Sequence, residues 1–369
     1  MRRLEIRSLT GSRGIAAALV FAYHFCGDDA SRPGFGRFPM VLAQVGWSGV
    51  TFFFALSGFL LTSIYHDRFS AGLTAAKLKV YAIRRVARIY SVYLALLFLV
   101  FAQIVARWKF QSGPSPDLLD FASHLTMTQA LFSRFATTLI PAAWSLTNEE
   151  QFYVLLPVLL LLASTRGRWL LLLLPFLFLL MGSALSSLLE KHGFLPDWRD
   201  FSLFGQLPTF FVGGLLGTYF RGHVNSGRRL SLRLSWLGWL FAFGLYAAGA
   251  WTYRSHLTWM QGLEGQALFG ACALAAIVGC LGNAFPSRVL GSPAFVYGGK
   301  ISYSFYLGHQ LVMTALKDQG AVPKWTWLFA AAAVACVLYE AVEKPAQRAI
   351  LRRWMHEVAP SPGQKPSPI

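Results

Sequence analysis

An arginine and a histidine stand eleven residues apart in the first apolar segment, at Arg13 and His24. In a helix, eleven steps of about 100° return to within about 20° of the start, so both side chains share one face, roughly 16 Å apart. Ala17 and Val20 lie between them on that face and leave room for a ligand. An arginine binds anions and a histidine accepts a hydroxyl proton. The alternative is that Arg13 reaches lipid phosphate and His24 hydrogen-bonds a neighbouring helix.

A second group of candidate ligands lies at 84–93, in the sequence RRVARIYSVY. Arg84 and Arg88 are four residues apart, so they share a face at the start of a helix, next to Arg85. Arginine forks bind phosphate groups in a bidentate way, and the pair could hold a phosphorylated donor. The alternative is a basic anchor that contacts lipid headgroups, and the pair taken alone favours that anchor.

Two adjacent carboxylates, Glu149 and Glu150, open a long apolar helix in the sequence WSLTNEEQFYVLLP at 144–157. Thr147 and Glu150 fit the T-x-x-E capping box, which would give Glu150 a structural role. Glu149 shares a helix face with Tyr153, and Glu150 points about 100° away. We therefore expect one glutamate to be structural and the other functional.

Two further motifs lie near the end of the chain. The segment ISYSFYLGH at 301–309 places several hydroxyl groups and His309, an alternative candidate for the base, in one predicted membrane helix. The segment YEAVEKP at 339–345 places two glutamates at the end of the last helix, where each is expected to pair with a basic residue. Polar residues are costly in hydrocarbon, so both motifs mark either packing contacts or a site.

The elements that must position these residues are membrane helices. Apolar residues make up 55% of the 369-residue chain and charged residues only 13%, with a mean hydropathy of +0.48. A soluble domain usually carries about 25% charged residues. These values predict an all-α, polytopic integral membrane protein with about ten transmembrane helices. The expected spans are 12–27, 44–64, 89–106, 143–163, 168–187, 203–220, 235–252, 263–281, 299–316 and 325–343.

The net charge of +17 is explained by where the basic residues fall, without a nucleic-acid partner. With a cytoplasmic N-terminus, 23 of the 33 Lys and Arg residues lie on the inner side. This positive-inside bias predicts that both termini are cytoplasmic. The first helix lacks a small-x-small cleavage site, so we expect it to belong to a single membrane domain, 1–357. The tail 358–369 is predicted to be disordered, and the four isolated cysteines predict no metal site.

Taken in order, these motifs resemble the acyltransferase-3 family of membrane O-acyltransferases, which modify lipopolysaccharide, exopolysaccharide, Nod factors, peptidoglycan and some macrolides. The positions that depart from the family's usual motifs bear on the identity of the acceptor rather than on the class of enzyme. Ser91 stands where proline is common, Asn148 replaces an apolar residue and Gly308 a tryptophan, and Gln310 and Leu311 replace a hydrophobic–proline pair. The matching elements, which span nearly the whole chain, are SRGIAAALVFAYH at 12–24, FFFALSGFLLT at 52–62, RRVARIY at 84–90, WSLTNEEQFYVLLP at 144–157, ISYSFYLGH at 301–309 and EKP at 343–345.

The resemblance implies an acyl-CoA donor and, as acceptor, a sugar hydroxyl in a surface glycan or glycolipid. It implies no bound cofactor or metal, and a multi-pass protein of the bacterial inner membrane that contacts lipids. His24 is then the base, with no other histidine expected near its face, and Glu149 or Glu150 orients the sugar or the histidine. The expected ligands of the donor phosphates are Arg13, Arg84, Arg85 and Arg88. The expected substrate contacts are Trp144, Ser145, Tyr153, Tyr303 and His309.

Two functions from other classes remain open. Asp28 and Asp29, just outside the first helix, suggest a lipid-carrier glycosyltransferase that keeps an acidic pair for a metal ion. The loop there is short and holds no second acidic cluster. A transporter or flippase is expected to show repeat symmetry with interrupted helices, and the sequence shows no such repeat.

Overall fold

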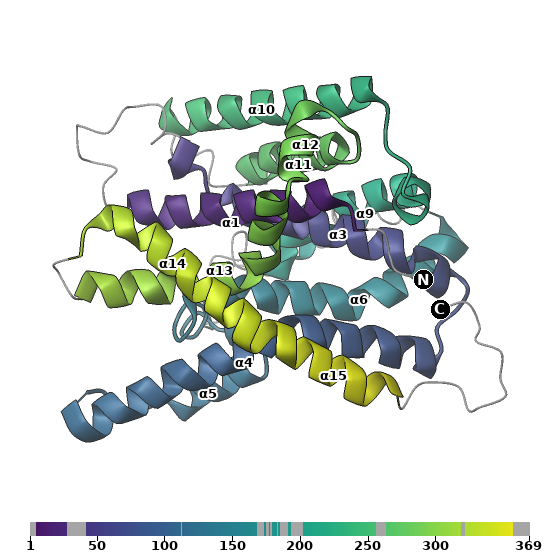
Figure 1. The fold of residues 1–369 in the computed structure, drawn as a ribbon. Helices are drawn as coiled ribbons and strands as arrows, with labels where there is room; N and C mark the ends of the chain where they lie inside the picture. The colour runs from purple at the N-terminus through teal and green to yellow at the C-terminus, as the bar shows by residue number, and fades with distance from the viewer. Residues whose placement is uncertain are drawn as a thin grey trace.

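The structure is a computed structural model that describes residues 5–27, 42–111, 113–167, 202–255, 263–318 and 322–356, with scattered positions in 173–192. These residues form helices and no strand (Figure 1). The α-helices are α1 (Arg7–Gly27), α3 (Ser48–Ser70), α4 (Ala75–Gln111), α5 (Leu118–Leu125), α6 (Trp144–Arg166), α9 (Leu203–Ser226), α10 (Leu232–Ser255), α11 (Leu263–Cys280), α12 (Phe285–Leu290), α13 (Pro293–Asp318), α14 (Trp327–Val337) and α15 (Lys344–His356). Short 3-10 helices are η1 (Gln129–Leu131), η2 (Pro141–Ala143) and η3 (Lys324–Thr326), and η4 (Leu338–Glu343) is a π-helix.

The predicted all-α class is confirmed for the described residues. Nine of the ten predicted spans fall on helices there, and 168–187 lies largely outside that part of the chain. Helix α4 begins in the basic segment before 89, ahead of the predicted span, and α14 continues through η4 into α15. The number of crossings and the side of the termini stay predictions. The described helical segments that are long and apolar enough to cross a membrane are Ser48–Ser70, Ala75–Gln111, Pro141–Arg166, Leu232–Tyr253 and Lys324–Met355.

Close helix pairs build the centre of the molecule. Helix α3 packs against α9, α1 against α13, and α10 against α11, while α14 and α15 cross the others diagonally (Figure 1). Glycine residues make the close contact between α3 and α9 possible. A Cβ atom at Gly58 would overlap the carbonyl oxygen of Phe210, and one at Gly213 would overlap that of Ala55. The two backbones therefore touch, which is how helices associate where lipid removes the hydrophobic driving force.

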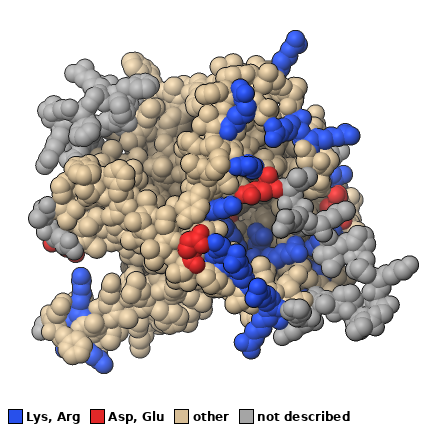
Figure 2. All heavy atoms as spheres, viewed as in Figure 1, with Lys and Arg blue, Asp and Glu red and all other residues tan. Residues whose placement is uncertain are grey.

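The basic side chains gather at one end of the helix bundle. Figure 2 shows Lys and Arg mostly toward the end where α1 begins and α15 ends (Figure 1). Arg68 and Arg166 lie in the last turns of α3 and α6, and these helices return to the same end. We call it the basic end. A one-sided distribution is what the positive-inside rule predicts for a membrane protein.

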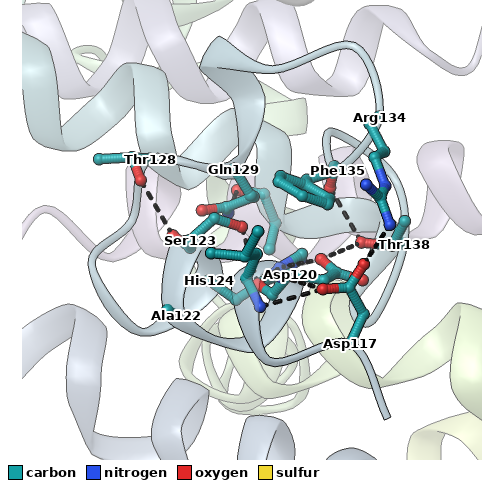
Figure 3. Close-up of polar contacts among 12 residues, drawn as sticks. Asp117, Asp120, Ala122, Ser123, His124, Thr128, Gln129, Arg134, Phe135 and Thr138 are labelled. Carbon is teal, nitrogen blue, oxygen red and sulfur yellow. Dashed lines mark hydrogen bonds and ion pairs between the residues drawn. The ribbon is translucent and has the colours of Figure 1, made fainter. Parts of the chain in front are cut away.

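A folded segment, 113–143, covers the opposite end of the bundle. Asp117 caps α5 by accepting the backbone N–H groups of Leu119 and Asp120, and the Arg134 guanidinium lies 2.5 Å from its carboxylate. The Thr138 hydroxyl donates to Asp120 over 2.7 Å, and Asp120 also contacts Nδ1 of His124 at 3.0 Å (Figure 3). We call this segment the cap. Its polar contacts fix the loop that reaches the site described below.

Candidate active site

Three cavities follow one another through the bundle and share lining residues. The proximal cavity, about 360 Å³, lies beside the start of α1. The arginine cavity, about 340 Å³, shares Arg13, Leu60 and Ile64 with it. The histidine chamber, about 390 Å³, shares Val50 and Tyr306 with the arginine cavity. The series therefore leads from the basic end, past Arg13, to the chamber under the cap.

The arginine cavity holds three guanidinium groups, from Arg13 on α1 and from Arg85 and Arg88 on α4. Arg84, which was expected to bind the donor together with Arg88, is absent from the lining of this cavity. Arg85 lies one position further round the helix, and its guanidinium carbon is 5.3 Å from the ring centroid of Tyr153. The Nε of Arg85 is buried and has no partner among the described residues. This N–H is a donor available to a ligand.

A buried carboxylate holds Arg88. Glu343 is fully buried, and its Oε1 lies 3.4 Å from the Nη1 of Arg88. Ser304 and Gln347 donate to the same carboxylate over 2.7 and 3.1 Å. Glu343 ends the π-helix η4, and such wider turns are common at functional sites. Glu340, the other glutamate of the motif, pairs with Lys344 at 2.6 Å, so the predicted pairing of both glutamates with basic residues is confirmed.

The two glutamates of α6 have different surroundings. Glu149 lines the arginine cavity and accepts hydrogen bonds from Ser57, over 2.5 Å, and from Tyr153. Glu149 is not among the described residues that line the histidine chamber, where it was expected to orient the sugar or His24. Glu150 faces the other way and accepts from the Tyr90 hydroxyl over 2.9 Å.

The predicted capping box at Thr147 and Glu150 is wrong. Helix α6 begins at Trp144, directly after the 3-10 turn η2, so Ala143 occupies the N-cap position. Thr147 is then buried inside the helix, and its hydroxyl has no partner among the described residues. Pro141 explains the early start, because proline suits the first turn of a helix.

The histidine chamber is lined by polar but uncharged side chains. His24, in the last turn of α1, faces it together with Trp47 and Trp144. None of the described lining residues is Lys, Arg, Asp or Glu. Thr137 and Pro141 bring the cap to the chamber wall. The amide side chains in the lining are Gln206, Gln266 and Gln310.

A second histidine lies beside His24. The ring centroids of His24 and His309 are 5.3 Å apart, so the expectation that no other histidine lies near the face of His24 is wrong. His309 is buried, and its Nδ1 donates to the carbonyl oxygen of Tyr306 over 2.6 Å. Its Nε2 has no partner among the residues described. Helix α13 packs along α1 and brings together two histidines 285 positions apart, which local spacing does not reveal.

The predicted substrate contacts are divided between the cavities. Trp144 lines the histidine chamber, whereas Ser145, Tyr153 and Tyr303 line the arginine cavity. His309 contacts the ring of His24 and lines none of the three cavities. Sequence reasoning missed the chamber residues Trp47, Gln206, Gln266 and Gln310. The three glutamines stand in apolar segments, and the cost of an amide in hydrocarbon was a signal that could have found them.

The histidine–carboxylate pair of the cap lies outside the cavities. Asp120 and His124 of the cap resemble half of a catalytic triad, but His124 is fully buried and lines none of the cavities described above (Figure 3). Their contacts hold the cap in place. Asp28 and Asp29, the predicted metal pair of a glycosyltransferase, lie outside the described residues. Within the described ranges, no group of three His, Cys, Asp or Glu residues could hold a metal ion.

The described residues combine apolar helices with a chamber that contains a histidine and an approach that is lined by arginines. The acyltransferase 3 family model, described as an acyltransferase domain, matches residues 6–339. The chain belongs to this acyltransferase family.

A curated relative is the peptidoglycan O-acetyltransferase OatA of Listeria monocytogenes. It is 28% identical over 167 residues, which cover 43% of this chain and 25% of the relative. The chain therefore spans about a quarter of the length of that relative. No solved structure matches the chain.

Proposed function

We propose that the protein transfers an acyl group, most simply acetyl, from acyl-CoA to a sugar hydroxyl of a surface glycan or glycolipid. The observation that carries this proposal is the row of cavities from the arginines of the basic end to His24. A CoA thioester has anionic phosphates at one end and the reacting carbonyl at the other, joined by a narrow pantetheine arm. The charged cavities suit the first end and the uncharged chamber suits the second.

The donor enters from the basic end in this proposal. Arg13 and Arg68 line the proximal cavity, and Arg13 continues into the arginine cavity beside Arg85 and Arg88. Guanidinium forks bind phosphate oxygens bidentately. Because Glu343 already pairs with Arg88, we assign phosphate binding first to Arg13 and to the unpartnered Nε–H of Arg85. The rise of about 16 Å along α1 from Arg13 to His24 is the path of the pantetheine arm.

His24 acts as the general base. It takes the proton from the sugar hydroxyl as that oxygen attacks the thioester carbonyl, and a tetrahedral intermediate with a negatively charged oxygen forms. The carbon–sulfur bond then breaks, and the CoA thiolate leaves with the proton that His24 holds. The products are the sugar ester and CoA-SH. Neutral donors in the chamber, among them the glutamine amides, are placed to stabilise the oxyanion.

The acceptor occupies the histidine chamber under the cap. Trp47 and Trp144 offer flat faces to a pyranose ring, and the chamber amides match sugar hydroxyls as donors and acceptors. The similarity to a peptidoglycan O-acetyltransferase supports acetyl as the acyl group and a cell-wall type glycan as the acceptor. In this arrangement the acceptor approaches from outside the cell, and the protein is a multi-pass protein of the inner membrane with both termini in the cytoplasm.

Two experiments test the proposal. Purified protein with acetyl-CoA, labelled in the acetyl group, and isolated glycan should form a labelled sugar ester. Mass spectrometry of surface glycans from cells with and without the gene should show a mass difference of one acetyl group on the acceptor. Glycans of identical mass from both cells, together with no labelled ester in vitro, would refute the proposed transfer.

Reporter fusions test the orientation separately. A reporter placed after His66 or Arg228 should behave as cytoplasmic, and one within 110–135 as external, because the basic residues lie at the end of the bundle away from the cap. The opposite pattern would reverse the route of the donor.

A further inference from the structure

Gln310 lies against the ring of His24, and its amide oxygen is without a partner. Its Nε2 is 3.3 Å from both Nδ1 and Nε2 of His24. Its Oε1 is buried and has no hydrogen-bond partner among the described residues. An amide nitrogen at this place donates to the unprotonated nitrogen of the imidazole. That contact would occupy the lone pair which a general base needs.

Turning the amide by 180° removes this conflict. The oxygen and nitrogen of a glutamine amide have nearly the same shape, so the hydrogen-bond network decides which way the group faces. With Oε1 toward His24, the amide accepts the imidazole N–H. The other ring nitrogen then carries the free lone pair. A base whose N–H is held by a third group is the arrangement that activates hydroxyl and thiol nucleophiles in other enzymes.

We propose that Gln310 is the positioning residue for His24, and that its amide oxygen accepts the imidazole N–H, so that the other ring nitrogen is free to take the acceptor's hydroxyl proton. This inference rests on the proposed function. The proton of the sugar hydroxyl moves to the free nitrogen of His24, and the N–H that faces Gln310 keeps its own proton throughout. Gln310 therefore stabilises both the neutral and the protonated ring without exchanging a proton itself.

The surroundings of His24 leave this task to Gln310. The titratable groups that face the ring from described elements are Tyr23 on α1 and Tyr306 and His309 on α13. Nδ1 of His309 donates to Tyr306, and no hydrogen bond joins the two imidazole rings in the described structure. No carboxylate lines the described part of the chamber. The amide of Gln310 takes the place that an aspartate holds in a Ser–His–Asp triad.

Three variants separate positioning from packing. Q310L keeps the size and removes the acceptor atom, and we expect kcat to fall roughly tenfold to a hundredfold, less than loss of the base itself, with the KM for acyl-CoA unchanged. Q310E restores an acceptor and should recover much of kcat. Thr314→Val is the matched control, because Thr314 is exposed one turn further along α13 and lines none of the three cavities.

The pH profile adds a readout that packing would not move. A base must be neutral to work, so kcat falls as pH drops and the base becomes protonated. The carboxylate of Q310E favours the imidazolium, so protonation occurs at higher pH and the acidic limb of the kcat profile should shift to higher pH. A kcat for Q310L equal to wild type, or a Q310E slower than Q310L with an unmoved limb, would overturn the proposal.

A spectroscopic test needs no turnover. In ¹⁵N spectra of histidine-labelled protein, with the His24 signals assigned by their loss in His24→Ala, we expect the chemical shift of a hydrogen-bonded ring N–H in wild type and the loss of that hydrogen bond in Q310L. The same ring nitrogen shifts in both proteins would refute the role of Gln310, whether or not the wild type transfers acyl groups. A wild type that transfers nothing would refute the proposed function alone, and these spectra would still decide for or against Gln310.

Discussion

The arginine cavity and the histidine chamber are neighbours of similar volume with opposite electrostatic character. Three arginines and Glu149 line the first, whereas none of the described lining residues of the second is Lys, Arg, Asp or Glu. Charged groups in a low-dielectric environment are retained where a charged ligand or partner compensates them. In the proposed function this difference separates two binding tasks, an anionic donor in the first cavity and a neutral acceptor with the reacting carbonyl in the second.

Tyr306 is the structural link between the two cavities. Its side chain lines both, and its hydroxyl lies 2.9 Å from the Ser145 hydroxyl and 3.1 Å from the Ala142 carbonyl oxygen. These contacts connect α13 to the start of α6, where the cap ends. A group that passes from the arginine side to His24 must therefore pass this tyrosine.

The largest expected effect is at the base. His24→Ala should lower acyl transfer by about 10²–10⁴-fold while the protein still inserts and binds CoA, because general base catalysis contributes this much. His309→Ala, at matched expression, should keep far more activity, since His309 is buried behind His24 and lines none of the three cavities. Robust transfer by His24→Ala with an inactive His309→Ala would move the base to His309.

The next effect concerns the donor side. Arg13→Lys keeps the charge but loses the bidentate fork, so the KM for acyl-CoA should rise roughly tenfold with kcat little changed. Arg84→Lys is the control, because Arg84 is absent from the lining of the arginine cavity. Steady-state kinetics with varied acyl-CoA measure both. Equal KM values for acyl-CoA in wild type and Arg13→Lys would indicate that Arg13 only anchors the protein to lipid.

Substitutions of the two glutamates of α6 test the role of the arginine cavity further. Glu149→Gln should raise the KM for acyl-CoA several-fold, because it disturbs the hydrogen bonds to Ser57 and Tyr153 that order the wall of the arginine cavity. Glu150→Gln weakens only the contact with Tyr90 and should cost about 1 kcal/mol of stability, with turnover retained. Thermal unfolding in detergent and donor kinetics separate the two. Interchanged results would exchange the two roles.

The smallest expected effect is on the acceptor side. Trp144→Phe keeps an aromatic face of smaller area in the histidine chamber, so the KM for the glycan should rise a few-fold and the KM for acyl-CoA should stay constant. Titration of each substrate at saturating levels of the other measures this. A change only in the KM for acyl-CoA would indicate that Trp144 contacts the donor instead of the glycan.

Much of the fold was predictable from composition, and part of the site from local spacing. Apolar runs gave the helices because lipid demands such runs, and the spacing of Arg13 and His24 correctly placed both on the face that follows the cavities. One local prediction was wrong, because α6 begins three residues before the expected cap at Thr147. Of the expected donor ligands, Arg13, Arg85 and Arg88 line the arginine cavity and Arg84 does not.

The rest of the site depends on contacts between distant segments. His309 and Gln310 reach His24 only because α13 packs along α1, and Glu343 reaches Arg88 because η4 places it between α4 and α13. No periodicity or residue spacing in the sequence predicts either contact. The glutamines of the chamber come from three different helices, so only the packed bundle shows that they converge.

The central claim is that donor and acceptor reach His24 from opposite ends of the bundle. Sealed membrane vesicles test it directly, because acyl-CoA carries several charges and does not cross a lipid bilayer. Inverted vesicles, with the cytoplasmic face outside, should use added acetyl-CoA and place the acetyl group on glycan enclosed in the lumen. Right-side-out vesicles should not use added acetyl-CoA until they are opened. Transfer by sealed right-side-out vesicles, at the rate of inverted ones, would contradict the account.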